Sequence, residues 1–265
     1  GDWSSDVCSS DLPITVKSPR EIELMAEAGR ILSQVHQELG KALHPGMSTL
    51  DIDRLGEEII RGYGCIPSFL NYNGYPASIC VSLNEEVVHG IPSADRIIKE
   101  GDIVSLDAGV IYKGYHSDAA RTHAVGEVSK EAEDLIRVTR ESFFEGIKYA
   151  KEGNHLFDIS GAIGRYAEER GYGVVRDLCG HGIGTALHEA PEIPNYEMNR
   201  KGVLLKAGMT LAIEPMINAG SWEVDWMDDD WTVVTRDRSL SAHYENTILI
   251  TDGEPRILSL TEDTP

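Results

Sequence analysis

Alternating apolar and polar residues predict a β-hairpin in the middle of the chain, from Ile103 to Val125. Apolar residues occupy every second position of its first strand, at Val104, Leu106, Ala108 and Val110. Asp107 therefore faces the opposite side, and the returning strand carries Asp118 after a turn at Lys113 and Gly114. The two carboxylates should be direct or diagonal neighbours across the hairpin. Because like charges this close repel without a cation between them, the pair predicts half of a metal site; a solvated hairpin is the alternative.

Apolar residues at helical spacing predict helices on both sides of this hairpin. The first should begin with a capping box at Ser18 and Glu21, with Pro19 at the first helical position, and should end at Gly40. Further helices are expected from Ser48 or Thr49 to Gly62, from Ser129 to near Gly153, and from about Phe157 to Arg170. A strand is expected at residues 79–83, and loops at residues 69–76 and 84–92.

Parts of the sequence recur with an offset of 107 residues. The corresponding residues are Gly46, Asp51 and Ile52 with Gly153, Asp158 and Ile159, and Lys99, Gly101, Val104, Leu106 and Asp107 with Lys206, Gly208, Leu211, Ile213 and Glu214. We therefore predict two similar halves, each of two helices followed by strands, packed about a pseudo-two-fold axis as one domain. Asp107 and Glu214 would then meet at the junction, where ligand sites are usually found.

Composition limits the partners and the compartment. With 44 acidic and 24 basic residues the net charge is −20, which argues against broad electrostatic binding to DNA, RNA or anionic lipid. The four cysteines have no C-x-x-C spacing, which fits a reducing cytoplasm, and no apolar run is long enough for a membrane span or signal core. Residues 1–12 differ in composition and resemble one reading frame of a sequencing-adapter oligonucleotide. We expect a non-native leader there, a natural disordered leader being the alternative, and a single catalytic domain over residues 13–265.

The second half adds further groups that suit a metal or a catalytic site. His181 lies in CGHGIG, where the flanking glycines permit close approach of a ligand, His188 lies in LHEAP, and Glu245 lies in SAHYENTILI. Glu214 ends an apolar strand just before Pro215, where an unpaired carboxylate would be costly. Each of these residues taken alone is more often a surface or core residue. Together, four carboxylates and one imidazole suit two divalent ions such as manganese, iron or cobalt.

The ordered motifs resemble those of the type I methionine aminopeptidases, over residues 18–259. The matching segments are YPASICVSLNEEVVHGIP, GDIVSLDAG, HSDAARTHAVG, CGHGIGTALHEAP, LKAGMTLAIEPMINAG and SLSAHYENTILIT. The resemblance implies an α/β fold of the duplicated "pita-bread" type, with an antiparallel sheet flanked by helices. It implies removal of an N-terminal methionine from new proteins when the next residue is small.

The resemblance also implies roles for individual residues. Asp107 would hold one ion, Asp118 and Glu245 would bridge two, and His181 and Glu214 would complete the second; cobalt, manganese or iron is expected, with zinc or nickel possible. Glu214 would exchange protons, and two ions can activate a water molecule and polarise the scissile carbonyl. His188 would stabilise the tetrahedral intermediate, and His89 would contact the nitrogen of the neighbouring peptide bond. Either histidine could instead act by orienting another group.

A methionine pocket is implied by Tyr72, Tyr75, Cys80 and Trp231, for which core packing is the alternative. The chain departs from the family pattern at Phe69, often a cysteine, at Leu187, often a phenylalanine, and at His243, often a glutamine. The role of His243 is left open by the sequence. Asn84 and Ser241 match positions whose carbonyl groups hold a sodium or potassium ion in relatives, a weaker assignment.

The rivals to this interpretation are few. Proline-specific peptidases and creatine amidinohydrolase share the fold, and a non-catalytic binding module on the same fold is the rival of another class. We expect a monomer that acts on peptide or protein N-termini. The segment from Ser221 to Arg238 has six acidic residues, two arginines and no lysine, a net charge of −4, where bacterial relatives carry lysines thought to reach ribosomal RNA. Ribosome binding should therefore be weak, unless this is only a solvated acidic turn and contact is made elsewhere.

Overall fold

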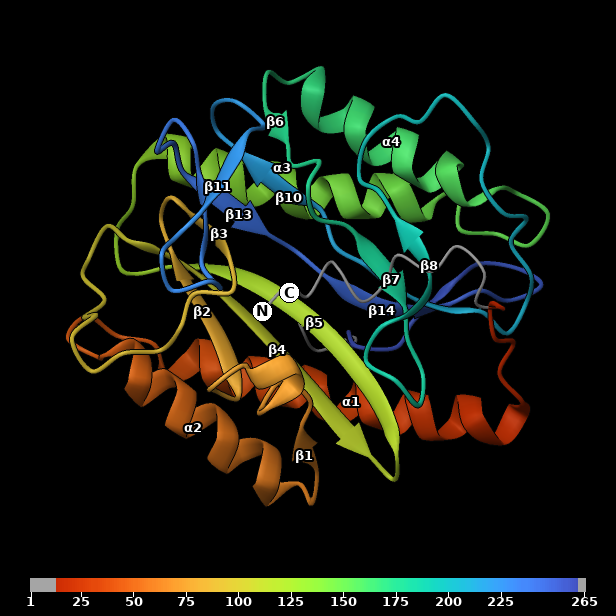
Figure 1. Cartoon of the computed structure of the whole chain (residues 1–265), viewed down its shortest axis with the longest axis horizontal. Helices are drawn as coiled ribbons and strands as arrows, with labels where there is room; N and C mark the ends of the chain where they lie inside the picture. Colours follow the sequence, from red (N-terminus) through yellow and green to blue (C-terminus); the bar gives the residue numbers. More distant parts are fainter. Residues whose placement is uncertain (1–12, 262–265) are drawn as a thin grey trace.

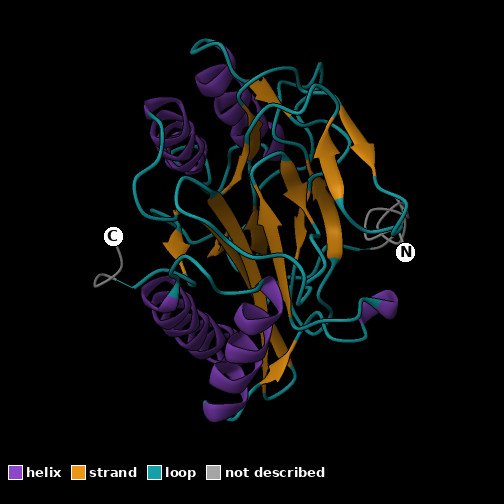
Figure 2. Ribbon diagram, turned by 90° about the vertical axis from the view of Figure 1, so that its left-hand side faces the viewer, coloured by secondary structure: helices purple, strands orange, loops and turns teal. Residues whose placement is uncertain are grey.

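The computed structural model describes residues 13–261, so the predicted leader at residues 1–12 lies outside the described residues. Helices cover one side of a set of antiparallel strands, and loops dominate the other side (Figure 2). In Figure 1 the first two helices lie below the strands and the next two lie above them. The α/β fold class predicted from the sequence is confirmed. No helix within residues 13–261 has the length and apolar character needed to cross a membrane.

The first half contains α1 (Pro19–Ala42), α2 (Thr49–Gly62), β1 (Ile66–Pro67), η1 (Tyr72–Gly74), β2 (Ile79–Leu83), β3 (Glu86–Val88), β4 (Ile103–Tyr112) and β5 (Tyr115–Ala124). The second half contains α3 (Lys130–Ile147), α4 (Leu156–Glu168), β6 (Gly173–Val174), β7 (Gly180–Gly182), β8 (Glu189–Ile193), β9 (Thr210–Ile213), β10 (Met216–Asn218), β11 (Val224–Trp226), β12 (Val233–Thr235), β13 (Ser241–His243), β14 (Asn246–Leu249) and β15 (Arg256–Ile257).

The predicted helix starts are confirmed because their caps are local features. Ser18 caps α1 through a capping box, in which its hydroxyl accepts from the N–H of Glu21 (3.2 Å) and its own N–H donates to the Glu21 carboxylate (3.0 Å). The helix ends were less accurate: α1 continues past Gly40, and α3 stops at Ile147 instead of near Gly153. After Ile147 the hydrogen bonds are those of tight turns, from the N–H of Ala150 to the carbonyl of Ile147 (3.0 Å) for example, and the N–H of Gly153 donates to the carbonyl of the distant Leu205 (3.1 Å).

One predicted loop proved partly wrong. Residues 84–92 contain the short strand β3, which pairs with β12 from the far end of the chain. The paired residues Val88 and Val233 are 145 positions apart in the sequence (233 − 88), so the local sequence could not reveal this pairing.

The predicted hairpin forms from β4 and β5. Asp107 lies opposite Ala120 and Gly109 lies opposite Asp118, so the two aspartates are diagonal neighbours on one face. The apolar residues of β4 turn the other way, into a core under α1 and α2 that includes Leu32, Leu39, Ile52, Val104, Leu106 and Val110. Burial of one face against the helices therefore presents both carboxylates on the opposite face.

The internal repeat has a structural counterpart. The N–H of Gly46 donates to the carbonyl of Ile98 (2.9 Å), and the residues offset by 107, Gly153 and Leu205, make the same bond (3.1 Å). Both glycines have positive φ, 97° and 92°, which explains why glycine recurs there. The second half has its own core under α3 and α4, formed by residues such as Phe143, Ile159, Leu211, Ile213 and Ile248.

The halves join edge to edge through β5 and the β13–β14 segment. Ala120 and Glu245 exchange two backbone hydrogen bonds, with N···O distances of 3.2 and 3.0 Å. These two residues are related by an offset of 125 instead of 107, because the hairpin of β11 and β12 is inserted before β13. By the same offset, Asp118 in β5 corresponds to His243 in β13. The junction between the halves therefore contains Glu245 and lies two residues from Asp118, both of which the sequence predicts at the candidate site.

Candidate active site

A pocket opens where the two halves meet, and both halves supply its walls. Its lining includes Val88, His89, Asp107, Asp118, Leu178, Cys179, Gly180, His181, His188, Glu192, Glu214 and Met216. Asp107 and Asp118 come from the first-half hairpin, whereas His181 comes from β7 and Glu214 follows β9. The junction predicted from the repeat is therefore the place where these carboxylates gather.

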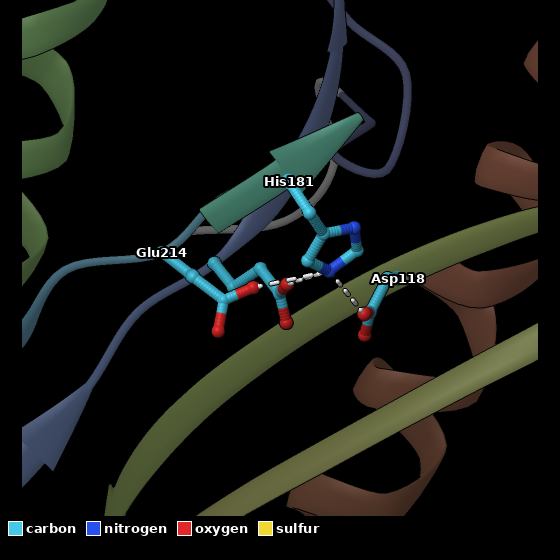
Figure 3. Close-up of side chains that lie close together, drawn as sticks. Asp118, His181 and Glu214 are labelled. Atoms are coloured by element: carbon cyan, nitrogen blue, oxygen red, sulfur yellow. Dashed lines mark ion pairs between the residues drawn. The ribbon is translucent and has the colours of Figure 1, made fainter. Parts of the chain in front are cut away.

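His181 is directed at the carboxylates of both halves (Figure 3). Its Nε2 lies 3.4 Å from Asp118 Oδ2, 3.4 Å from Glu214 Oε2 and 4.0 Å from Glu245 Oε2. The glycines on both sides of His181 are required: a Cβ at Gly180 would lie 2.3 Å from the carbonyl oxygen of Ala212 in β9. Glycine therefore lets β7 approach β9 closely enough for the imidazole to reach the carboxylates.

Two groups of side chains could each hold a cation. Asp118, His181, Glu214 and Glu245 form one group, and Asp107, His243 and Glu245 form the other. Within each group the candidate ligand atoms all lie within 4.8 Å of one another, and Glu245 belongs to both. The five ligands expected from the sequence are brought together. His243, whose position relative to the metals the sequence left open, lies among them.

The electrostatics of the site favour a cation. Burial, and then the charge of Asp118, raise the pKa of both Asp107 and Glu245 well above the usual range. Burial opposes protonation of His181, but the carboxylates of Asp118 and Glu214, each 3.4 Å from its Nε2, raise its pKa to about 10. The carboxylates therefore attract positive charge strongly, and a divalent ion would satisfy them better than a proton shared among them.

Unsatisfied atoms point to the same conclusion. Within the described part of the chain, Asp107 Oδ1, Asp118 Oδ1, His181 Nε2 and both carboxylate oxygens of Glu245 are buried without a hydrogen-bond partner. Buried polar atoms are normally paired, so this concentration of unpaired ones calls for a ligand. Oxygen atoms with an imidazole nitrogen are donors that divalent transition metals accept, and the residues present fit such ions.

His188 and His89 lie beside this cluster. The ring of His188 packs against that of His181 with centroids 4.2 Å apart, and its Nδ1 lies 2.8 Å from the hydroxyl of Tyr72. Burial, and then the charge of His181, hold the pKa of His188 well below its usual range, so its imidazole is neutral. His89 lines the same pocket with a positive φ of 59°, a strained conformation for a residue other than glycine.

The residues expected to form a methionine pocket also gather in one place. Tyr75, Cys80 and Trp231 belong to a buried apolar cluster against which Tyr72 packs. The rings of Tyr75 and Trp231 meet edge to face, with centroids 5.2 Å apart. Phe69 and Leu187, the two departures from the family pattern, belong to the same cluster.

The two residues expected at a monovalent cation site are neighbours. The N–H of Ser241 donates to the carbonyl oxygen of Asn84 (2.9 Å), and Asn84 has a positive φ of 53°. Its side-chain oxygen accepts from the N–H of Ile103 (3.1 Å). These contacts hold the turn after β2 against β13.

Some pocket residues were missed by sequence analysis. Val88, Leu178, Cys179, Glu192 and Met216 line the pocket without having been singled out. Glu192 lies in β8 directly opposite His181, a pairing that becomes visible only once the sheet register is known. The one available signal was the position of Glu192 shortly after the LHEAP motif.

Comparison with known proteins agrees with this geometry. The model of the family described as metallopeptidase family M24 matches residues 23–252. The methionine aminopeptidase of Clostridium acetobutylicum is 55% identical over 249 residues, 94% of this chain and all of that protein. The chain belongs to the methionine aminopeptidases of metallopeptidase family M24. The resemblance seen in the sequence is thereby confirmed.

Other relatives define the neighbourhood of the chain. Methionine aminopeptidase 1 of Bacillus subtilis is 51% identical to this chain. The match covers 90% of this chain and 96% of that protein. The crystal structure of a methionine aminopeptidase from Thermotoga maritima superposes with a TM-score of 0.92 at 46% identity, covering 94% of this chain and all of that one. An Xaa-Pro dipeptidase from Bacillus anthracis superposes with a TM-score of 0.75 at 26% identity. The superposition covers 94% of this chain and 62% of that one. The pita-bread fold expected from the resemblance is thus confirmed.

Proposed function

We propose that this chain is a metal-dependent methionyl aminopeptidase that removes the N-terminal methionine from peptides and new proteins when the second residue is small. The observation that carries the proposal is the buried set of unpaired carboxylate and imidazole atoms. Beside it lies a buried aromatic cluster that contains Cys80, the residue paired with Asp107 across β2 and β4. The relatives from Clostridium acetobutylicum and Bacillus subtilis, at 55% and 51% identity, are both named methionine aminopeptidases, which supports the same activity.

The metal centre is proposed to hold two divalent ions. Asp107 would hold one ion, His181 and Glu214 the other, and Asp118 and Glu245 both, which fits the presence of Glu245 in both candidate groups. Oxygen-rich donor sets of this kind suit cobalt, manganese or iron, and zinc or nickel are also compatible. Such ions, when bound, activate a water molecule and polarise the carbonyl of the scissile bond.

Glu214 is the proposed proton carrier. One of its carboxylate oxygens faces His181 at 3.4 Å, and the side chain lines the open pocket, within reach of a substrate. A carboxylate in this position can accept a proton from the attacking water and return it to the leaving amine. Its contact with His181 fixes its orientation before the substrate arrives.

His188 is proposed to stabilise the tetrahedral intermediate. If the Tyr72 hydroxyl donates to Nδ1, the proton of the neutral imidazole stays on Nε2, and Nε2–H would donate to the developing oxyanion. His89, whose backbone is held at positive φ on the pocket wall, would contact the peptide nitrogen beyond the scissile bond and position the substrate.

The pocket of Tyr72, Tyr75, Cys80 and Trp231 is proposed to bind the methionine side chain. Sulfur packs favourably against aromatic ring edges, so a thioether fits this surface. Tyr75 is held by donating its hydroxyl to the carbonyl of Gly90 (3.0 Å), which keeps the ring in place.

Several further features are proposals that rest on the family resemblance. Asn84 and Ser241, joined by a backbone hydrogen bond, would bind one sodium or potassium ion through their carbonyl groups. Residues 13–265 would form one catalytic domain, since the halves share both a sheet junction and the site. The protein would act as a cytoplasmic monomer without DNA or membrane partners.

A substrate screen tests the proposed activity. The purified chain, stripped with a chelator and reloaded with cobalt or manganese, should cleave Met-Ala-Ser and leave Ala-Pro peptides intact. Activity should disappear with the chelator and return with the metal. Preferential cleavage of X-Pro bonds would place the chain with the proline-specific peptidases instead, and turnover that is indifferent to the chelator would contradict a metal-dependent mechanism.

A further inference from the structure

We propose that His243 is a sixth protein ligand of the metal centre and supplies an imidazole nitrogen on the side of Asp107. This inference rests on the proposed metal-dependent function and extends its ligand set. It concerns a residue whose role the sequence left open, at a position where the family often has glutamine.

The ring of His243 is buried among the candidate metal ligands. His243 ends β13 and is 2% exposed. Its ligand atom lies within 4.8 Å of ligand atoms of both Asp107 and Glu245, and its Nε2 lies 3.7 Å from Glu214 Oε1. The imidazole is therefore directed at the same carboxylates that the ions would neutralise.

The second step is the lack of a hydrogen bond. Within residues 13–261, His243 Nε2 is a buried nitrogen with no partner at hydrogen-bond distance. At 3.7 Å, the nearest carboxylate oxygen is too far away for a normal bond. Leaving a buried polar atom unpaired costs free energy, and the unpaired atoms of Asp107, Asp118, His181 and Glu245 in the two candidate groups are proposed ligand atoms. His243 Nε2 belongs to that set.

The backbone of His243 is anchored to the first half of the chain. The hydroxyl of Thr122 in β5 accepts from the N–H of His243 (2.9 Å) and donates to its carbonyl oxygen (2.9 Å). His243 is also the counterpart of Asp118 across the pseudo-two-fold axis, so the two side chains approach the centre from symmetric positions. A donor site held this firmly is typical of a preorganised ligand.

The consequence is a nitrogen donor on each side of Glu245, from His181 on one side and His243 on the other. Imidazole favours cobalt, nickel and zinc over manganese more than carboxylate oxygen does. Replacing His243 by glutamine should therefore weaken cobalt binding at one of the two positions more than manganese binding.

The experiment measures ligation directly. The metal-free chain is loaded with two equivalents of Co²⁺, and X-ray absorption at the cobalt edge gives the average number of imidazoles per ion. Titration calorimetry with Co²⁺ and with Mn²⁺ gives the affinities. The variants are His243→Gln and, as a matched control, His123→Gln, since His123 also has a buried, unpaired Nε2 but belongs to neither candidate metal group.

We expect two imidazoles per pair of cobalt ions in the unaltered chain and in His123→Gln, but one in His243→Gln. The affinity of one site for Co²⁺ should fall at least about tenfold in His243→Gln, with a smaller loss for Mn²⁺. One imidazole per pair of ions in the unaltered chain would overturn the proposal, even if the variant failed to fold. A His181→Gln variant separates the His243 proposal from the proposed function. If both His243→Gln and His181→Gln left the imidazole count and the affinity unchanged, the metal centre itself, and with it the proposed function, would be wrong.

Discussion

The hydroxyl of Tyr72 lies 2.8 Å from Nδ1 of His188, so a residue of the candidate methionine pocket holds the imidazole proposed to stabilise the transition state. Their rings lie 5.3 Å apart at a tilt of 49°. Binding of a side chain against Tyr72 and orientation of His188 are therefore linked. If Tyr72 contacts the methionine side chain as proposed, the same residue also orients His188, so occupancy of the proposed pocket would favour the proposed catalytic geometry.

Replacement of His188 by alanine should lower kcat by about 10² to 10³ while leaving metal binding unchanged, because one hydrogen bond to the transition state is lost. Tyr72→Phe keeps the ring and removes only the bond to Nδ1, so a smaller loss is expected. Steady-state kinetics and calorimetric metal titration on the same preparations give both quantities. An unchanged kcat in His188→Ala would remove this residue from the mechanism.

Replacement of Asp118 by alanine should abolish metal occupancy and turnover together. The carboxylate of Asp118 is buried among His181, Glu214 and Glu245, and its proposed role is to hold both ions. Elemental analysis after gel filtration, paired with a peptide assay in excess Co²⁺, measures the two losses. Near-normal hydrolysis by the metal-replete variant would rule out this bridging role.

The hairpin and the repeat were predictable because their signals are local or duplicated. Strict alternation along β4 determined which face Asp107 occupies, and the recurrence of Gly46 as Gly153 marked two equivalent turns. The diagonal placement of Asp107 and Asp118 remained one of two options until the register was known. The ordered motifs led to the five candidate metal ligands and to both candidate catalytic histidines.

What the sequence left open depends on contacts between distant segments. His243 faces the centre because β13 joins β5 through the junction of Ala120 and Glu245, a pairing with no local signal. Glu192 reaches the pocket wall through the register of β8 on β7, which shifts at a bulge beside His181. Long-range pairing and register therefore account for the residues missed.

Specificity should require a small second residue. The first side chain would pack against Tyr75 and Cys80, and we expect the carboxylates and His89 on the wall of the neighbouring pocket to crowd the second side chain. A misplacement of about 1 Å can cost about 10²-fold in rate. We therefore expect kcat/KM for Met-Gly-Met substrates to exceed that for Met-Leu-Met by about that factor. Comparable values for both peptides would refute the crowding argument.

The free energy of unfolding should decrease as the pH falls below about 6.5, and protonation of His123 should contribute to this decrease. Burial, and then the charge of Arg121, lower the pKa of His123 from 6.5 to about 4. The unfolded chain thus binds this proton more readily, so the stabilisation is present above about pH 6.5 and is lost as the pH falls toward 4. In His123→Gln the dependence of unfolding free energy on pH between 6.5 and 4 should be shallower by up to about 1.4 kcal/mol per pH unit. Urea unfolding of the metal-free proteins at several pH values measures this; parallel curves would contradict the assignment.

The acidic hairpin of β11 and β12 affects whether the enzyme can bind to ribosomes. Its tip carries exposed acidic residues, Asp228, Asp229 and Asp230, and the segment 221–238 has a net charge of −4. Arg236, one of its two arginines, is already paired with Glu223 and Asp225 on the same hairpin. Since phosphate contacts supply most nonspecific affinity for RNA, this surface should repel ribosomal RNA.

We therefore hypothesise that the chain acts on released proteins or docks on ribosomes only weakly, through another surface. Co-sedimentation with ribosomes from its own source, at low and moderate salt, should show little binding, and Asp228→Lys should leave binding the same or increase it slightly. Asp252→Lys, a charge reversal at another exposed turn, controls for the change in net charge. Tight, salt-sensitive binding that is lost in Asp228→Lys but kept in Asp252→Lys would identify the acidic hairpin as a docking element and refute the hypothesis.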